Sequence, residues 1–363
     1  MNKDLLAILD RFALEAPVKE VKPLGSGLIN DTFKVNTEGS APDYVLQRIN
    51  HAIFQDVDLL QHNIQAVTSH IRAKLQAAGE KDLDRKVLRL IALKEDPGKT
   101  YFFDGASYWR VTVFIPDAFV YDTVDPKYSN FAGQAFGQFE AMLADIPDKL
   151  GETIPDFHNM ELRARQLEEA AAADKAGRMK DPEVQAILAE IRQHVHEMCK
   201  AERLYREGKL PKRICHCDTK VNNMMFDAAG NVLCVIDLDT VMPSFVFSDF
   251  GDFLRTAANA VAEDSPEIEK VAFRKDIFEA FAKGYVSSAK VFLTPLEKEM
   301  LPYGTLLFPF MQAVRFFADY LNGDTYYKIK YPEHNLVRTR NQMALFRSVL
   351  SNMDYMAQFV ASL

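Results

Sequence analysis

The chain has 363 residues, which excludes a single small domain, because one hydrophobic core stops growing at about 250–300 residues. Its 43 basic and 51 acidic residues give a net charge of −8, so we expect no broad basic surface for nucleic acid. No apolar run approaches the ~18 residues that span a membrane, and the N-terminus lacks a signal-peptide core. We therefore expect a cytoplasmic protein without a membrane partner, and nothing in the sequence specifies its oligomeric state.

The N-terminal third is rich in strand-forming runs separated by turns. Leucines at helical spacing first predict an amphipathic helix over residues 1–15. An antiparallel sheet is then predicted from the runs FKV, YVLQRIN, KVLRLIAL, KTYFFD and SYWRVTVFI, between about Lys22 and Pro116. Residues 53–76 have apolar residues at helical spacing and no proline or glycine, so they predict one helix against the sheet.

After Pro116 the sequence changes to long helical patterns. Residues 130–146 and 161–207 predict helices, and the second of these stretches is rich in alanine. An exception is the segment 214–241, where two apolar runs flank the turn signal DAAGN and predict a hairpin among helices. The expected fold class is therefore α+β, with a sheet-rich first lobe and a mainly helical second lobe.

The four cysteines lack the paired spacing of a disulfide framework or a zinc ribbon. Two of them flank His216, but neighbouring residues of a strand point to opposite faces, which disfavours a zinc site. We expect four reduced thiols.

The strongest chemical signal is the pattern His216-x-Asp218-x-x-x-x-Asn223, which Asp237 follows fourteen residues later on an apolar run. This spacing is typical of a kinase catalytic loop and its metal aspartate. Asp218 is suited to accept the proton of an attacking hydroxyl, and Asn223 and Asp237 to bind a magnesium ion. Lys220 is a candidate to offset charge on the transferred phosphoryl group. Alternatively, the acids and the histidine only cap turns and end a strand.

A literal Asp-Phe-Gly occurs at residues 249–251, but its aspartate lies twenty-six residues after Asn223. That separation is about twice what one short hairpin allows, so Asp237 is the better metal ligand. Asp249 and Asp252 open a helical stretch, and two interpretations remain for them: N-terminal capping of the helix, or bracing of the catalytic loop.

A glycine-rich segment near the start, Gly25-Ser26-Gly27, precedes the strand-like residues 32–35. Backbone amides of such a hairpin can approach phosphates, and Asn30 stands where a third glycine is usual. The next strand normally carries a phosphate-binding lysine, but here it offers Gln47 or Arg48. Arg48 supplies the charge, whereas strand parity allows Gln47 to face the nucleotide, and both remain open.

On these motifs the chain resembles the aminoglycoside phosphotransferase and choline kinase superfamily, and within it the N-acetylhexosamine 1-kinases. The segments that carry the resemblance are GSGLINDTFKV, YVLQRIN, HCDTKVNNMMFD, VIDLDTVMPSFVFSDFGD and VRFFADYLNGDTYYKIKYPEHNLVRTRNQ. It implies a protein kinase-like fold of two lobes. Residues 1–116 would form the nucleotide-binding lobe, and residues 117–363 the helical catalytic and acceptor-binding lobe.

The same resemblance implies a reaction in which ATP and Mg²⁺ phosphorylate the anomeric hydroxyl of N-acetylglucosamine or N-acetylgalactosamine. Asp218 would be the catalytic base and would also contact the sugar. Asn223 and Asp237 would bind the metal ion. Gly25 to Thr32 would cover the phosphates, with Thr32 among the nucleotide ligands.

Arg315, Phe316, Asp319 and Tyr320 recur at helical spacing and share one face of a predicted helix. Such a face offers polar partners and an aromatic surface to a hexosamine, with Arg315 and Tyr320 as the candidate ligands. Alternatively, the aromatic residues are core and Arg315 pairs with Asp319. Two rival functions also stay open: a kinase of this fold for choline, homoserine, a methylthio-sugar or an aminoglycoside, and a non-catalytic nucleotide-binding module.

Overall fold

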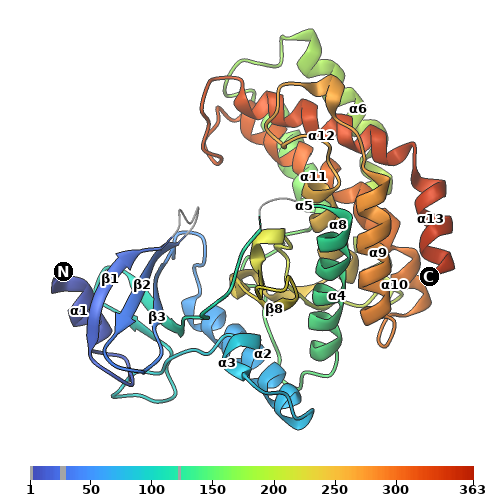
Figure 1. Cartoon of the computed structure of the whole chain (residues 1–363). Helices are drawn as coiled ribbons and strands as arrows, with labels where there is room; N and C mark the ends of the chain where they lie inside the picture. Colours follow the sequence, from blue (N-terminus) through green and yellow to red (C-terminus); the bar gives the residue numbers. More distant parts are fainter. Residues whose placement is uncertain (1–2, 25–29, 122–123) are drawn as a thin grey trace. The chain divides into compact units, whose positions relative to one another are not determined.

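The computed structural model describes residues 3–24, 30–121 and 124–363, which cluster into two compact units (Figure 1). The first unit takes in Met1–Val120, Asp145–Pro155 and Met224–Met242. The second takes in the ranges Tyr121–Ala144, Asp156–Asn223 and Pro243–Leu363. The division of roles between residues 1–116 and 117–363 stays a prediction. The first unit also includes two segments from beyond residue 116.

Five antiparallel strands form the sheet of the first unit, in the order β1-β2-β3-β5-β4 (Figure 1). Gln47 of β3 lies opposite Thr32 of β2 and Arg110 of β5, and cross-strand partners point to the same face of a sheet. These three polar residues therefore form a row across the sheet. The strands are β1 (Val18–Pro23), β2 (Asp31–Thr37), β3 (Tyr44–Ile49), β4 (Tyr101–Phe103) and β5 (Tyr108–Val113).

The opposite face of this sheet carries the apolar core of the first unit. Leu46 and Val111 are fully buried there and pack with Leu9 of α1 (Lys3–Leu9). The period-two alternation between these residues and the polar row is what a sheet with one apolar face requires. The predicted N-terminal helix is confirmed as α1, and the predicted helix of residues 53–76 as α2 (Val57–Ala77).

The prediction of a strand for the run KVLRLIAL is wrong. α3 (Leu83–Lys86) ends at its first residue, and the remainder makes only isolated bridges, Leu90 with Thr112 and Leu93 with Phe12. The physical reason is that β4 already pairs with the first half of that edge of β5, so only a short stretch of edge remains.

The predicted hairpin is confirmed by β7 (Met224–Phe226) and β8 (Val232–Val235), which pair antiparallel around a turn closed by the Asp227 carboxylate. A short 3₁₀ turn, η2 (Leu238–Thr240), follows. From α2, Asn63 donates from Nδ2 to the carbonyl oxygens of Gly151 and Val241, at 2.8 and 2.9 Å. This amide fixes the chain that leaves η2 within the first unit.

The second unit is mainly helical, and α4 (Pro126–Leu143) and α9 (Lys275–Ala289) run side by side through it (Figure 1). They approach closely because glycines line the contact. A Cβ added at Gly284 of α9 would lie 2.0 Å from the Asn130 oxygen of α4, and one at Gly137 of α4 would lie 2.6 Å from the Tyr285 oxygen. This close approach brings the buried polar residues of both helices together.

The other helices of the second unit enclose an aromatic core around α8 and α11. A Cβ at Gly251 of α8 would lie 2.3 Å from the Gly304 oxygen of α11, so the glycine of the Asp-Phe-Gly triplet serves helix packing. The elements are α4 (Pro126–Leu143), α5 (Met160–Ala173), α6 (Pro182–Met198), α7 (Lys200–Arg206), β6 (Arg213–Cys215), η1 (Val221–Asn223), β9 (Met242–Ser244), α8 (Val246–Ala257), η3 (Ile268–Lys270), α9 (Lys275–Ala289), α10 (Pro295–Glu299), α11 (Leu301–Leu321), α12 (His334–Leu350) and α13 (Met353–Ser362).

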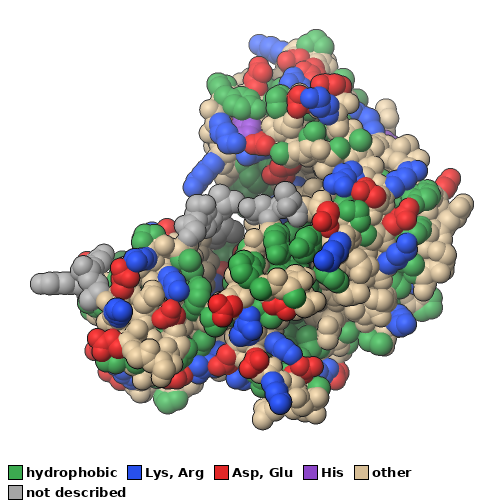
Figure 2. All heavy atoms as spheres, viewed as in Figure 1, with side chains coloured by type: hydrophobic (Ala, Val, Ile, Leu, Met, Phe, Trp, Pro, Cys, Tyr) green, Lys and Arg blue, Asp and Glu red, His purple; other side chains and the backbone are tan. Residues whose placement is uncertain are grey.

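Acidic and basic side chains lie next to one another over the α6 and α12 end of the second unit (Figure 2). Two ion pairs link these helices there: Arg340 with Glu183 at 2.6 Å and Arg347 with Glu190 at 2.5 Å. Among the described residues, no helix has the length and apolar character that crossing a membrane requires.

Candidate active site

The catalytic-loop residues predicted from the sequence lie together in the segment that runs from the end of β6 through η1. Lys220 Nζ is 2.6 Å from Asp218 Oδ1 and 2.9 Å from Oδ2. Asn223 Nδ2 donates to the Asp218 carbonyl oxygen at 2.7 Å and approaches its Oδ2 at 3.3 Å. The Asp218 amide donates to Nδ1 of His216 at 3.3 Å. Four residues of the motif are therefore joined in one hydrogen-bonded loop.

Two buried carboxylates of α8 accept hydrogen bonds from the backbone of this loop. The two oxygens of Asp249 accept the backbone amides of His216 and Cys217, at 2.6 and 2.7 Å. Asp252 Oδ2 accepts the amide of Thr219 at 3.0 Å. Bracing of the loop is therefore observed for both acids, and Asp249 also lies in the first turn of α8. The helix itself starts earlier, at Val246, with no side-chain cap.

The loop needs this support because Cys217 has φ 64°, a left-handed conformation that costs a residue with a Cβ about 1 kcal/mol or more. The strained residue immediately precedes Asp218 and is fully buried. The hydrogen bonds that two backbone amides donate to Asp249 keep the turn in place. They thereby set the direction of the Asp218 side chain. Backbone strain of this kind is typical of functional sites.

Both bracing acids are electrostatically perturbed. Burial raises the pKa of Asp249, while the His216 ring and the two donated amides oppose the shift. Burial likewise raises the pKa of Asp252 to about 6, and the adjacent Arg255 limits the rise. The loop is thus held by carboxylates whose negative charge is unfavourable in a buried site. Hydrogen bonds to such carboxylates are strong, and the loss of one of these bonds is strongly destabilising.

The predicted metal aspartate, Asp237, belongs to the first unit and follows β8. Its side chain is exposed, and its φ of 61° is left-handed, a conformation that aspartate tolerates better than most residues. Two residues later, Asp239 is buried and pairs with the guanidinium of Arg110. Asn30 Nδ2 donates to Asp239 Oδ2 at 2.7 Å. Asp239 therefore ties the segment of Asp237 to the sheet.

Arg110 is the residue that sequence reasoning missed. It is buried on β5, where its Nε donates to Gln47 Oε1 at 2.9 Å and its Nη1 bonds to Asp239. The available signal was a single charged residue inside the otherwise uncharged strand YWRVTV, because a charge buried in a sheet needs a partner. By contrast, Arg48 is exposed and pairs with the exposed Asp31.

The structure describes only some of the residues that were predicted to form the nucleotide loop. Gln47 also donates to Thr32 Oγ1 at 3.3 Å, so Thr32, Gln47 and Arg110 share one face of the sheet. Gly25, Ser26 and Gly27 lie outside the described residues. Nucleotide binding by Asn30, Thr32 and Arg48 stays a prediction.

The comparisons with known proteins decide the family. Residues 20–288 match the phosphotransferase enzyme family. The chain belongs to this family. An antiparallel sheet with a mainly helical remainder is the fold of this phosphotransferase family, and the predicted fold class is confirmed.

Solved structures share the fold at low sequence identity. An aminoglycoside phosphotransferase from Alicyclobacillus acidocaldarius is 14% identical with a TM-score of 0.64, covering 98% of this chain and 96% of its own. A choline kinase from Cryptosporidium parvum is 15% identical with a TM-score of 0.59, covering 100% and 99%. A spectinomycin phosphotransferase, solved with ADP and spectinomycin, is 14% identical with a TM-score of 0.51, covering 99% and 98%.

The residues predicted to bind magnesium in this phosphotransferase have suitable donor atoms. Both described side-chain bonds of Asn223 are donated by Nδ2, which leaves its Oδ1 for a cation. Asp237 adds an exposed carboxylate. Amide and carboxylate oxygens are the ligand types that Mg²⁺ prefers, so the donor atoms of each residue fit the ion, and Mg²⁺ binding by the two residues stays a prediction.

The predicted acceptor residues of the phosphotransferase do not form one cluster. Arg315 lies over the rings of Phe157 and Tyr327, with its Cζ 5.5 and 5.7 Å from their centroids. Tyr320 is instead buried under Arg178, whose Cζ is 3.9 Å from the ring centroid. Arg315 and Tyr320 therefore have separate neighbours, and the role of each in acceptor binding stays a prediction.

Asp319, the predicted ion-pair partner of Arg315, instead accepts hydrogen bonds from backbone amides. Its carboxylate accepts the backbone amides of Thr325, Tyr326 and Tyr327, at 2.9, 2.8 and 3.0 Å. These bonds fold the loop after α11 back onto the helix and bring Tyr327 to Arg315. The alternative of an i,i+4 ion pair is therefore not what the structure shows. Tyr327 is a neighbour that spacing along α11 could not reveal.

Positive charge accumulates beside this group. Burial together with Arg315 lowers the pKa of Arg163 to about 10. Burial and the same two arginines hold the pKa of His158 well below its usual value, so its imidazole is neutral. The Nδ1 atom of His158 is buried without a hydrogen-bond partner among the described residues. The surroundings of Arg315 thus favour a ligand that brings oxygen acceptors.

Proposed function

We propose that this phosphotransferase transfers the γ-phosphoryl group of ATP to the anomeric hydroxyl of an N-acetylhexosamine, such as N-acetylglucosamine or N-acetylgalactosamine. The observation that carries the proposal is the braced loop, in which Asp218 has Lys220 and Asn223 within hydrogen-bond distance. A carboxylate beside a cation and an amide is the side-chain set that phosphoryl transfer to a hydroxyl requires.

In this mechanism the residues of the loop prepare the acceptor. Asp218 orients the anomeric hydroxyl and takes its proton as the oxygen forms a bond to the γ-phosphorus. The bond from that phosphorus to the bridging oxygen breaks, and ADP leaves. Lys220, now paired with Asp218, offsets negative charge that develops on the transferred group.

ATP is the proposed donor, in line with the ADP bound to the related spectinomycin phosphotransferase. Asn223 and Asp237 would hold Mg²⁺, which supplies charge neutralisation between the phosphates when it is bound. Among cations, Arg48 was predicted to contact the phosphates, and the buried Arg110 is a second candidate on the same sheet. Gln47, the other residue predicted to face the nucleotide, shares its face of the sheet with Arg110.

The surroundings of Arg315 support a neutral, oxygen-rich acceptor. A guanidinium donates to hydroxyl and acetamide oxygens, and the rings of Phe157 and Tyr327 offer apolar faces to a sugar. A cationic acceptor such as choline or an aminoglycoside would meet like charge from Arg163 and Arg315. This observation supports the choice of a sugar in the proposal.

A panel assay tests the proposal. The purified protein is incubated with ATP, Mg²⁺ and, in parallel, N-acetylglucosamine, N-acetylgalactosamine, glucose, choline, homoserine and kanamycin, with products identified by mass and phosphorus NMR. We expect phosphorylation of a hexosamine, abolished by Asp218→Asn. Phosphate on another acceptor would keep the kinase and reject the sugar, and nucleotide binding without any product would indicate a non-catalytic module.

A further inference from the structure

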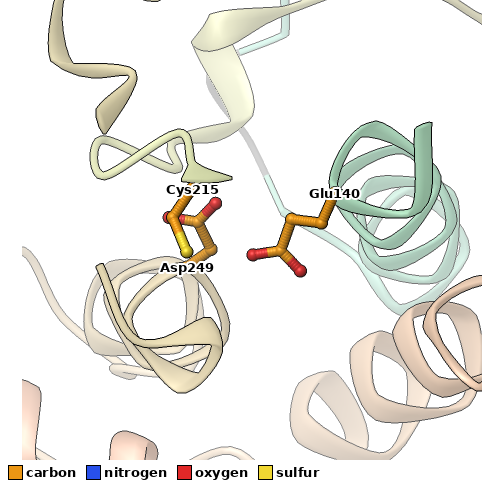
Figure 3. A group of neighbouring side chains, drawn as sticks. All are labelled: Glu140, Cys215 and Asp249. Atoms are coloured by element: carbon orange, nitrogen blue, oxygen red, sulfur yellow. The ribbon is translucent and has the colours of Figure 1, made fainter. Parts of the chain in front are cut away.

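A buried carboxyl group lies next to the acid that braces the catalytic loop. Glu140 of α4 is only 2% exposed, and its side chain points toward Cys215 and Asp249 (Figure 3). Potential ligand atoms of these three residues all lie within 4.8 Å of one another. Glu140 has no part in the proposed transfer step and belongs to none of the sequence motifs.

The hydrogen bonds around this pair do not satisfy two charged carboxylates. Both oxygens of Asp249 accept loop amides, and Glu140 Oε2 accepts the hydroxyl of Tyr285 on α9. Glu140 Oε1 is buried and has no donor among the described residues. Two adjacent anions in a buried site repel each other, so the arrangement is favoured when one of them carries a proton or when they share a cation.

We propose that Glu140 is a positioning residue that carries a proton on its carboxyl group and donates it in a hydrogen bond to the Asp249 carboxylate. Asp249 then remains the charged partner and keeps accepting the amides of His216 and Cys217. Carboxyl oxygens of Glu140 and Asp249 lie within 4.8 Å of each other. Burial together with the neighbouring Asp249 charge raises the pKa of Glu140 well above its usual value.

The other groups that face Glu140 agree with this assignment. Tyr285 and Cys215 are both buried, and burial raises the pKa of each side chain well above its usual value, so both face Glu140 as neutral groups. Tyr285 donates to Glu140 and leaves Oε1 for the proton. The only negative charge in the group is therefore that of Asp249, and it has three donors.

A metal ion bridging Glu140, Cys215 and Asp249 is the competing explanation. Against it, burial raises the pKa of the Cys215 thiol well above its usual value, so the third group is a neutral thiol, whereas the form that binds metal ions is the thiolate. A neutral acid that donates a hydrogen bond in an apolar site is the simpler solution.

A spectroscopic experiment on the wild-type protein tests the proton directly. With ¹³C-labelled glutamate carboxyls, NMR at pH 7 should show one resonance at the position of a protonated acid, and Glu140→Gln should remove it. If every glutamate resonance is that of an ionised carboxylate, the proposal is wrong. A stoichiometric metal ion that is present in the wild type and lost in Glu140→Gln would also overturn it.

Kinetics test the positioning role, which rests on the proposed phosphotransferase function. Glutamine can still donate to Asp249, so Glu140→Gln should keep kcat within about threefold of the wild type. Glu140→Met fills the space without a donor and should lower kcat by about 10- to 100-fold, with the KM for ATP unchanged. Equal loss in both variants, or no loss in Glu140→Met, would contradict the positioning role.

Glu297→Gln is the matched control, because Glu297 is also buried but lies on α10 and is held ionised by Arg213. It should lower stability and leave kcat per folded molecule unchanged. If Glu140→Met does not fold, the wild-type NMR spectrum still decides the proton. A protonated Glu140 in a wild-type protein without phosphotransferase activity would reject the proposed function and keep this protonation.

Discussion

Two buried aspartates, one in each unit, have hydrogen-bond partners of different kinds. Asp249 accepts neutral backbone amides of the catalytic loop, and we infer a proton donated by Glu140. Asp239 instead pairs with the cation of Arg110 and accepts an amide hydrogen of Asn30. Each acid fixes a short segment that carries a predicted functional aspartate, Asp218 or Asp237.

The two aspartates differ in the charge that remains buried when the partner of the aspartate is removed. A buried acid held by neutral donors can become neutral itself and lose only hydrogen bonds. A buried acid held by an arginine becomes an unpaired charge when the arginine is removed, which costs far more. We therefore expect the braced loop to respond mainly in activity and the sheet pair mainly in stability.

The largest expected effect is the loss of catalysis in Asp218→Asn. Removing a catalytic base typically lowers the rate by 10²- to 10⁴-fold, so kcat should fall by about that amount with N-acetylglucosamine as acceptor. The free energy of unfolding should stay within about 1 kcal/mol of the wild type, because Asp218 is only partly buried. Asp276→Asn, at an exposed ion pair with Arg274, is the control and should change neither quantity.

In the first unit, Arg110→Met should lower the free energy of unfolding by about 3–5 kcal/mol, because it leaves the charge of Asp239 buried and unpaired. Urea denaturation measures this. Arg48→Met, at an exposed pair, should cost no more than about 1 kcal/mol.

The double variant Arg110→Met, Asp239→Leu sharpens that test, since it removes both charges. We expect it to be more stable than Arg110→Met alone. A double variant that is as unstable as the sum of the two single changes would show that the pair is not coupled.

The pH dependence of stability distinguishes Asp252 from an ordinary surface acid. Burial raises its folded-state pKa to about 6, above its usual 3.8, so the folded protein holds a proton that the unfolded chain loses between about pH 4 and 6. Stability contributed by this group therefore falls as pH rises through that window, by roughly 2–3 kcal/mol. Urea denaturation should show the wild type losing stability relative to Asp252→Asn as pH rises from about 4 to 6, and a wild type that gains stability relative to the variant over that window would contradict the account.

The smallest expected effect concerns the acceptor. Arg315→Met should raise the KM for N-acetylglucosamine by about tenfold and leave the KM for ATP unchanged, because it removes donors to sugar oxygens. Steady-state kinetics against both substrates measure the two constants. Arg192→Met, at an exposed pair with Glu168, is the control, and an equal rise in both KM values for Arg315→Met would point to misfolding.

Local features of the site could be predicted from the sequence. Asp218, Lys220 and Asn223 lie in one short segment, so their spacing predicted the loop that the structure shows. The helix α2 was predicted from its apolar periodicity because that signal is also local.

Long-range partners could not be predicted. Arg110 and Asp239 are 129 residues apart in the sequence. Glu140 and Asp249 lie on two different helices, α4 and α8, and come together only in the folded second unit. The choice between Gln47 and Arg48 depended on strand register, which sequence periodicity leaves ambiguous by one residue.

The position of the phosphate in the product tests the central claim most directly. The product of ATP, Mg²⁺ and N-acetylglucosamine should show, in proton and phosphorus NMR, coupling between the phosphorus and the anomeric hydrogen, and it should lack a reducing end. Such a product, made by the wild type and not by Asp218→Asn, is the result that we predict. Phosphate on another hydroxyl of the sugar, or product formation undiminished in Asp218→Asn, would contradict the account.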